Sequence, residues 1–175
     1  MKTLVFLFIS AGAYAQSGVY MTYDDYVNNK LSYANQCDGK NKEIKTNLVF
    51  NLPYVTVAST DGKVKLDKDN IYAVSSCDQS LIRFENNQAY YLQEKGAVWI
   101  FYKEVSVNEG KRSVIQKRYY FSTTGDSELK ELTIKNVKDA FPENHKLHEL
   151  LDSHQQCYVS DEVVNVNHLL KKSVQ

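Results

Sequence analysis

Residues 71–121 constrain the fold most, because they read as five consecutive antiparallel strands with a turn signal between each pair. Tyr, Phe, Trp and β-branched residues are concentrated here, and these residue types favour a pleated, half-buried surface. The densest runs are residues 90–92, 98–102 and 119–121. The pattern therefore predicts an antiparallel sheet, and it indicates no chemistry.

Turn residues predict how the hairpins pair. A two-residue loop at Asn86 and Asn87 sets Ile82 opposite Tyr91, because asparagine tolerates the positive φ that such loops need. A second loop at residues 95–96 sets Leu92 opposite Trp99, which gives a hairpin with apolar residues on both faces. Such a hairpin is covered on both sides, so we expect a barrel-like fold, a sandwich or a helix-covered sheet.

Two other regions complete the strand pattern. The dipeptide Asp61-Gly62 predicts a hairpin in which Val57 lies opposite Leu66, and residues 44–50 alternate as a strand would. Beyond Tyr102 the apolar residues thin out, since Glu104 and Ser106 fall on one face, so this end of the strand is expected to run into solvent.

From residue 132 the apolar period changes from two to about three and a half, which is typical of helices. Thr133 caps the first helix and Pro142 ends it; the second spans about 143–155 and the third begins at Ser160. The predicted fold is α+β: an antiparallel β-meander of about seven strands, mainly in residues 44–123, followed by two to three C-terminal helices, mainly in residues 133–172.

The N-terminus predicts export. Met1-Lys2, a short apolar run and the small residues up to Ala15 have the form of a secretory signal peptide covering residues 1–15, which leaves residues 16–175 as a single domain. No later segment is long and apolar enough to span a membrane. Gln16, rather than cysteine, follows the expected cleavage point, which argues against a lipid anchor. A soluble periplasmic or extracellular protein is expected.

Charge excludes some partners. The sequence has 21 Lys and Arg against 21 Asp and Glu, so no strong net field is available to attract nucleic acid or anionic membranes. No glycine-rich phosphate loop is present, and no cofactor is predicted.

Three cysteines allow three disulfide pairings in an oxidising compartment. Cys37 and Cys77 lie in or beside loops that link strands, where a bridge forms with little strain, so Cys37–Cys77 is a possible pair. A catalytic thiolate is the alternative for Cys157, because His154 lies three residues before it.

One helical stripe has residues that can bind metal: His145, His148, Glu149 and Asp152 at i, i+3, i+4 and i+7. Their order matches neither the zincin motif nor its inverted form. A solvated polar face accounts for the same residues, and we predict no metal there. An extracytoplasmic hydrolase that uses His145 and His148 on this helix is the alternative function.

The abundant tyrosines suggest binding. Exposed aromatic side chains stack on sugar rings or anchor protein partners, whereas buried ones build the core. We therefore expect an exported, non-catalytic module for interaction or envelope structure, with a protein or glycan partner bound through exposed aromatics and with no nucleic acid.

The chain contains several groups of short motifs: Gly18-Val19-Tyr20 with Tyr23-Asp24-Asp25-Tyr26, Ile71-Tyr72-Ala73-Val74 with Cys77-Asp78, Tyr90-Tyr91-Leu92, and Leu132-Thr133-Ile134 leading to Phe141-Pro142-Glu143-Asn144. Together these motifs resemble a family of uncharacterised exported proteins of Bacteroidota. The resemblance implies an extracytoplasmic setting and no assigned activity.

Overall fold

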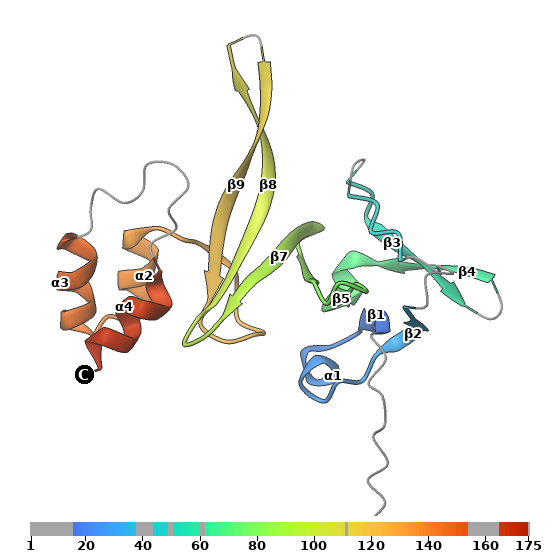
Figure 1. Cartoon of the computed structure of the whole chain (residues 1–175), viewed down its shortest axis with the longest axis horizontal. Coiled ribbons are helices and arrows are strands. Elements are labelled where there is room, and N and C mark those ends of the chain that lie inside the picture. Colours follow the sequence, from blue (N-terminus) through green and yellow to red (C-terminus); the bar gives the residue numbers. More distant parts are fainter. Residues whose placement is uncertain are drawn as a thin grey trace, which may run out of the picture.

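An open, eight-stranded antiparallel sheet forms the centre of the molecule (Figure 1). The computed structural model describes residues 16–37, 44–48, 51–59, 62–110, 112–153 and 165–174, and the statements below concern these residues. The strand order is β10-β9-β8-β7-β6-β5-β1-β2, and β3 and β4 form a separate two-stranded sheet. The strands are β1 (Gln16–Tyr20), β2 (Ser32–Gln36), β3 (Tyr54–Ser59), β4 (Gly62–Asp67), β5 (Ala73–Ser75), β6 (Leu81–Glu85), β7 (Gln88–Lys95), β8 (Trp99–Glu109), β9 (Arg112–Ser122) and β10 (Lys130–Glu131).

The predicted α+β class is confirmed, since three helices follow the strands: α2 (Ile134–Ala140), α3 (His145–Ser153) and α4 (Val166–Ser173). The sheet of the described residues does not close into a barrel. The predicted meander, in which each strand lies beside the next one in sequence, is wrong at the N-terminal end of the sheet. There the neighbour of β5 is β1 and not β4. The β1 residue Val19 pairs with Val74, so two buried apolar side chains meet there.

Of the three predicted hairpin registers, β6–β7 is confirmed, and β7–β8 and β3–β4 are wrong. Ile82 pairs with Tyr91, which confirms the β6–β7 register, and both Asn86 and Asn87 have positive φ. In β7–β8, however, Trp99 lies opposite Lys95 rather than Leu92. A shift between Leu92 and Glu94 absorbs the additional loop residues.

The β7–β8 loop is longer than predicted because α4 binds it. The Val98 N–H donates to Asn167 Oδ1 over 2.8 Å, and Asn167 Nδ2 donates to Glu94 Oε1 over 2.9 Å. A Cβ at Gly96 would lie within 2.6 Å of Asn167, so glycine permits this close approach. The side chain of Val98 is thereby buried against the helices.

In the β3–β4 hairpin, Val57 pairs with Val64 instead of Leu66. The register differs from the predicted one by two residues, which leaves every side chain on its predicted face. The strand predicted over residues 44–50 is also wrong for its described part: Lys45 makes an isolated bridge to Thr56, and no regular strand forms.

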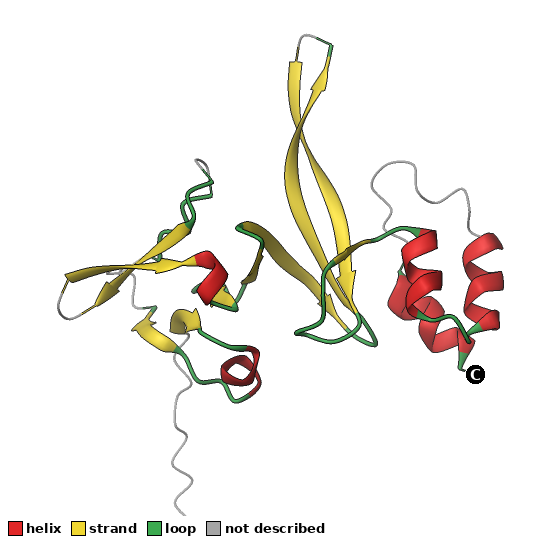
Figure 2. Ribbon diagram, turned by 180° about the vertical axis from the view of Figure 1, so that it is seen from behind, coloured by secondary structure: helices red, strands yellow, loops and turns green. Residues whose placement is uncertain are grey.

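One face of the sheet carries two separate apolar layers. The β3–β4 hairpin covers β1, β5 and β6 at one end, and α2–α4 cover the base of β8 and β9 at the other (Figures 1 and 2). The buried residues under the hairpin are Val19, Val55, Val57, Ile71, Val74, Ile82 and Phe84. The tyrosines Tyr91, Tyr102 and Tyr119 lie between the two layers, one on each of three neighbouring strands.

The short helix α1 (Tyr23–Val27) contributes Tyr23 and Tyr26 to a cluster with Trp99 and Phe101 on the opposite face. Thr22 caps this helix in a capping box with Asp25. Thr133 likewise caps α2, where it accepts a hydrogen bond from the Asn136 N–H. The predicted start of the third helix, residues 160–164, lies outside the described residues.

Candidate functional site

The β8–β9 hairpin projects from the molecule as a long arm (Figure 1). Its base packs in the core through Trp99, Ile100, Phe101 and Phe121. Beyond Tyr102 the two strands continue through seven register pairs, from Lys103↔Arg118 to Glu109↔Arg112. At about 3.3 Å per residue these pairs extend over about 20 Å. We call residues 103–118 the arm.

Both backbone edges of the arm lack a neighbouring strand among the described residues. The β7–β8 pairing ends at Tyr91↔Tyr102, and the β10–β9 pairing involves only Tyr120 and Phe121. Strand edges of this kind present a row of N–H and C=O groups that can pair with another chain. The arm can therefore accept a further strand on either side.

Positive charge is concentrated in the arm. Its described residues include Lys103, Arg112, Lys117 and Arg118, against Glu104 and Glu109, although the whole chain is balanced. The apolar side chains of Val114 and Ile115 are exposed, Ile115 by 72%. A basic surface with exposed apolar residues is a suitable contact for an acidic, partly apolar partner.

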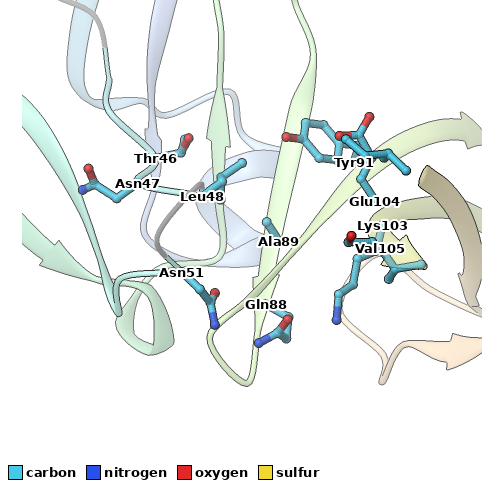
Figure 3. Close-up of a pocket in the computed structure, with 12 residues that line it drawn as sticks. Thr46, Asn47, Leu48, Asn51, Gln88, Ala89, Tyr91, Lys103, Glu104 and Val105 are labelled. Carbon is cyan, nitrogen blue, oxygen red and sulfur yellow. The ribbon is translucent and has the colours of Figure 1, made fainter. Parts of the chain in front are cut away.

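A cleft separates the arm from the rest of the molecule (Figure 3). It has a volume of about 770 Å³. One wall comes from the segment before β3 and the start of β7, and the other from β8 and β9 of the arm. Its lining residues are Thr46, Asn47, Leu48, Asn51, Gln88, Ala89, Tyr91, Lys103, Glu104, Val105, Ser106 and Ile115.

Aromatic and cationic side chains meet at the base of the arm. The Tyr91 and Tyr102 rings stack with centroids 5.0 Å apart, and Lys117 Nζ lies 4.2 Å from the centre of the Tyr102 ring. Burial raises the pKa of Tyr91, with a smaller contribution from the Glu104 charge. Tyr91 therefore remains a neutral phenol that can donate one hydrogen bond.

The four residues of the candidate metal-binding stripe lie on α3, and the structure does not make three of them converge on one point. The rings of His145 and His148 are 6.1 Å apart, and His148 Nε2 lies 3.0 Å from the Phe141 carbonyl oxygen. Asp152 pairs with Lys138 at 2.6 Å, and Glu149 is exposed. No group of three or more His, Cys, Asp or Glu residues in the described part of the chain could hold a metal.

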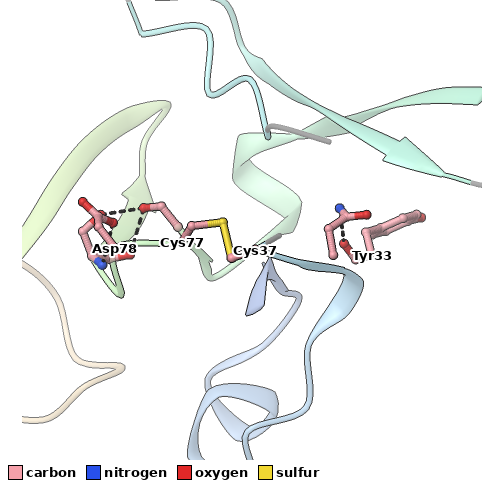
Figure 4. The surroundings of a disulfide bond; sticks show 7 residues. Tyr33, Cys37, Cys77 and Asp78 are labelled. Atoms are coloured by element: carbon pink, nitrogen blue, oxygen red, sulfur yellow. Dashed lines mark hydrogen bonds between the residues drawn. A yellow bond between two sulfur atoms is a disulfide. The ribbon is translucent and has the colours of Figure 1, made fainter. Parts of the chain in front are cut away.

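The structure joins Cys37 to Cys77, one of the three pairings that the sequence allowed (Figure 4). The bridge ties the end of β2 to the loop between β5 and β6, with Cα atoms 5.6 Å apart. Beside it, hydrogen bonds from Ser80 lower the pKa of Asp78. His154 and Cys157 lie outside the described residues.

Most of the aromatic residues pack rather than project. Trp99 is only 6% exposed and contacts Tyr23 and Tyr26. The clearest exposed example is Tyr33, which is 37% exposed. The aromatic cluster around Trp99 is thus partly buried, whereas the β9 residues 112–118 of the arm are all exposed.

A partly buried ion pair holds the loop between β9 and β10. The Arg83 guanidinium donates to the Gly125 carbonyl and pairs with Glu85 at 3.2 Å, and Glu85 in turn accepts from the Leu129 N–H. Tyr72 Oη donates to the same Gly125 carbonyl over 2.7 Å. These contacts have a structural role, because they join Tyr72 and β6 to the loop between β9 and β10.

None of the helices that the structure describes has the length and apolar character needed to cross a membrane. Comparison with protein-family models, with curated proteins and with solved structures found no match to this chain.

The arm was partly visible in the sequence, whereas the cleft was not. Loss of apolar residues beyond Tyr102 predicted a strand that enters solvent, and residues 103–109 do so. The cleft depends on Leu48, which comes from the segment predicted to be a strand over residues 44–50, and on Asn51, which follows that segment. No local pattern places that segment against β7 and the arm.

Proposed function

We propose that this protein is an exported, non-catalytic interaction module that binds a protein partner through its β8–β9 arm. The observation that carries the proposal is the arm itself: seven register pairs extend beyond the core, with both strand edges free in the described structure. An isolated two-stranded hairpin is only marginally stable in water. A partner strand would supply the missing neighbour.

Export is supported by two independent features. The N-terminal sequence has the form of a signal peptide, and the Cys37–Cys77 bridge belongs to an oxidising compartment. The resemblance to exported proteins of Bacteroidota agrees with the same location.

The alternative, a hydrolase that uses the α3 stripe, has weaker support. His145 and Glu149 are exposed, and Asp152 is paired with Lys138, so no three of the stripe residues converge on one point. Zinc analysis after dialysis tests it: stoichiometric zinc that is lost in the double variant His145→Ala/His148→Ala would favour the hydrolase.

Photo-crosslinking in the producing cells tests the proposed function. A photoreactive amino acid replaces Ile115 on the arm, and the matched control replaces Val27 on α1, which is 57% exposed. We expect discrete covalent adducts with one exported protein from position 115 and none from position 27. Equal labelling at both positions, or no adduct from position 115, would contradict the proposal.

A further inference from the structure

We propose that the cleft between β7 and the arm takes an extended polypeptide segment of a partner protein, with alternating apolar and acidic residues, as an additional strand on β8. This inference rests on the proposed function and specifies the partner of the same surface. It follows from three properties of the cleft: its free backbone edge, its two chemically different faces, and its charge.

The backbone edge of β8 selects a polypeptide. From Lys103 onward, β8 pairs with β9 alone among the described strands, because the β7–β8 pairing stops at Tyr91↔Tyr102. The N–H and C=O groups on the β7 side of this segment therefore face the cleft without a strand among the described residues. A peptide in extended conformation satisfies such groups by adding to the sheet.

Alternation along the strand determines the side chains of the partner. Side chains of an added strand point alternately to the two faces of the sheet. On the Tyr102 face they meet a largely apolar wall formed by Leu48, Ala89, Tyr91 and Ile115, with Glu104 beside it. On the opposite face, the β8 residues that line the cleft are Lys103 and Val105.

The positive charge extends beyond Lys103 on that face. Arg118 is the register partner of Lys103, and Arg112 follows on the same face of β9 at the tip of the arm, opposite Glu109, so this face keeps a net positive charge. Acidic side chains on the added strand would lie within the field of these three groups, whereas basic ones would be repelled. The expected partner segment is thus apolar at every second position and acidic between.

Two other occupants fit the cleft less well. Pairing of two arms from two copies through their β9 edges would bring Arg112, Lys117 and Arg118 of each copy together, and like charges oppose such pairing. Nucleic acid would gain little from free strand edges, and Glu104 in the cleft wall would repel phosphate.

The test uses the full exported chain and fluorescent synthetic peptides. One peptide alternates valine and glutamate, and its control alternates valine and lysine. We expect the glutamate peptide to bind at least about tenfold more tightly in fluorescence anisotropy. Binding should also slow the hydrogen exchange of backbone amides at 103–109 more than of those at 112–118.

Charge reversal provides the matched comparison. The double variant Lys103→Glu/Arg118→Glu should reverse the preference for the glutamate peptide, whereas Lys63→Glu/Lys65→Glu on β4, an equal charge change away from the arm, should retain it. Equal binding of both peptides, no binding, or exchange protection confined to β9 would overturn the inference. Tighter binding of single-stranded DNA, or a dimer of the free chain in sedimentation, would overturn it too.

Failure of this inference and failure of the proposed function give different results. If position 115 forms crosslinks in cells but the glutamate peptide does not bind, the arm binds a partner by another contact and only the strand-addition inference falls. If neither occurs, both fall.

Discussion

Strands β8 and β9 form two regions, the base and the arm, which have the same backbone pairing but differ in burial. At the base, Trp99, Ile100 and Phe101 of β8 are buried, with Phe121 of β9 across from them. In the arm, every described β9 residue from 112 to 118 is exposed. The cross-strand register continues without a shift through both regions. Burial, not backbone hydrogen bonding, therefore separates the part that stabilises the fold from the part that is free to bind.

This difference predicts how stability is distributed. Core burial supplies most of the favourable free energy of folding, whereas exposed substitutions away from special features change it little. Changes at the base and in the buried core should thus lower stability, and changes in the arm should lower binding without lowering stability.

The largest effect is expected from Trp99→Ala at the base. Trp99 contacts Tyr23, Tyr26 and Phe101, so its removal leaves a large cavity and should destabilise the protein by about 3–5 kcal/mol. Denaturant unfolding followed by circular dichroism measures this change. An unchanged midpoint would mean that the base does not stabilise the fold.

Loss of the disulfide should have the next largest effect. Cys37 and Cys77 are 40 residues apart in sequence, and closing a loop of this length stabilises by about 2–4 kcal/mol. Cys77→Ser should lower the free energy of unfolding by that amount. Cys157→Ser, which leaves the bridge intact, is the control and should unfold like the wild type; equal loss in both variants would contradict the assignment.

Lysine in the core and lysine in the arm provide a third comparison. Lys68 is 1% exposed, its Nζ has no hydrogen-bond partner among the residues that the structure describes, and burial lowers its pKa. Lys68→Met should therefore stabilise the protein by about 1–3 kcal/mol at neutral pH. Lys117→Met in the exposed arm should change stability by less than about 0.5 kcal/mol.

The sign of the pH dependence follows from the lowered pKa. Because the unfolded state holds the Lys68 proton more tightly, wild-type stability is reduced at neutral pH and recovers as pH rises toward 10.5, the ordinary pKa. The advantage of Lys68→Met should shrink over that range. Tyrosine ionisation affects both proteins alike, so the difference between their unfolding free energies isolates Lys68; a constant or growing advantage would contradict this account.

The smallest effect is expected from Ile115→Ala in the arm. With 72% of its surface exposed, Ile115 should contribute less than about 0.5 kcal/mol to folding. Ile100→Ala, the same change at the base, should cost about 2–5 kcal/mol. Thermal or denaturant unfolding of the pair measures the contrast directly, and similar losses would remove the distinction between base and arm.

Local turn chemistry explains which parts of the fold the sequence predicted. Asn86 and Asn87 both adopt positive φ, so their two-residue loop sets the β6–β7 register without help from distant residues. The caps Thr22 and Thr133 are local in the same way. The β7–β8 register failed because Val98 is bound by Asn167, a residue 69 positions away.

In the candidate site, too, the features set by local sequence were predictable and those set by long-range contacts were not. Alternation beyond Tyr102 is a local signal, and it predicted that this part of β8 enters solvent. By contrast, β1 lies beside β5 and Leu48 lines the cleft through contacts between distant parts of the sequence. The periodicity of apolar residues cannot predict such contacts. The cleft could therefore be recognised only in the structure.

A shortened arm tests the central claim most directly. Replacing residues 106–115 by Asn-Gly closes the hairpin at Val105 and Gln116, which face each other in the present register. The free energy of unfolding, measured by denaturant titration, should stay within about 0.5 kcal/mol of the wild type. A loss of several kcal/mol would show that the arm stabilises the fold, and would contradict its assignment as a free binding element.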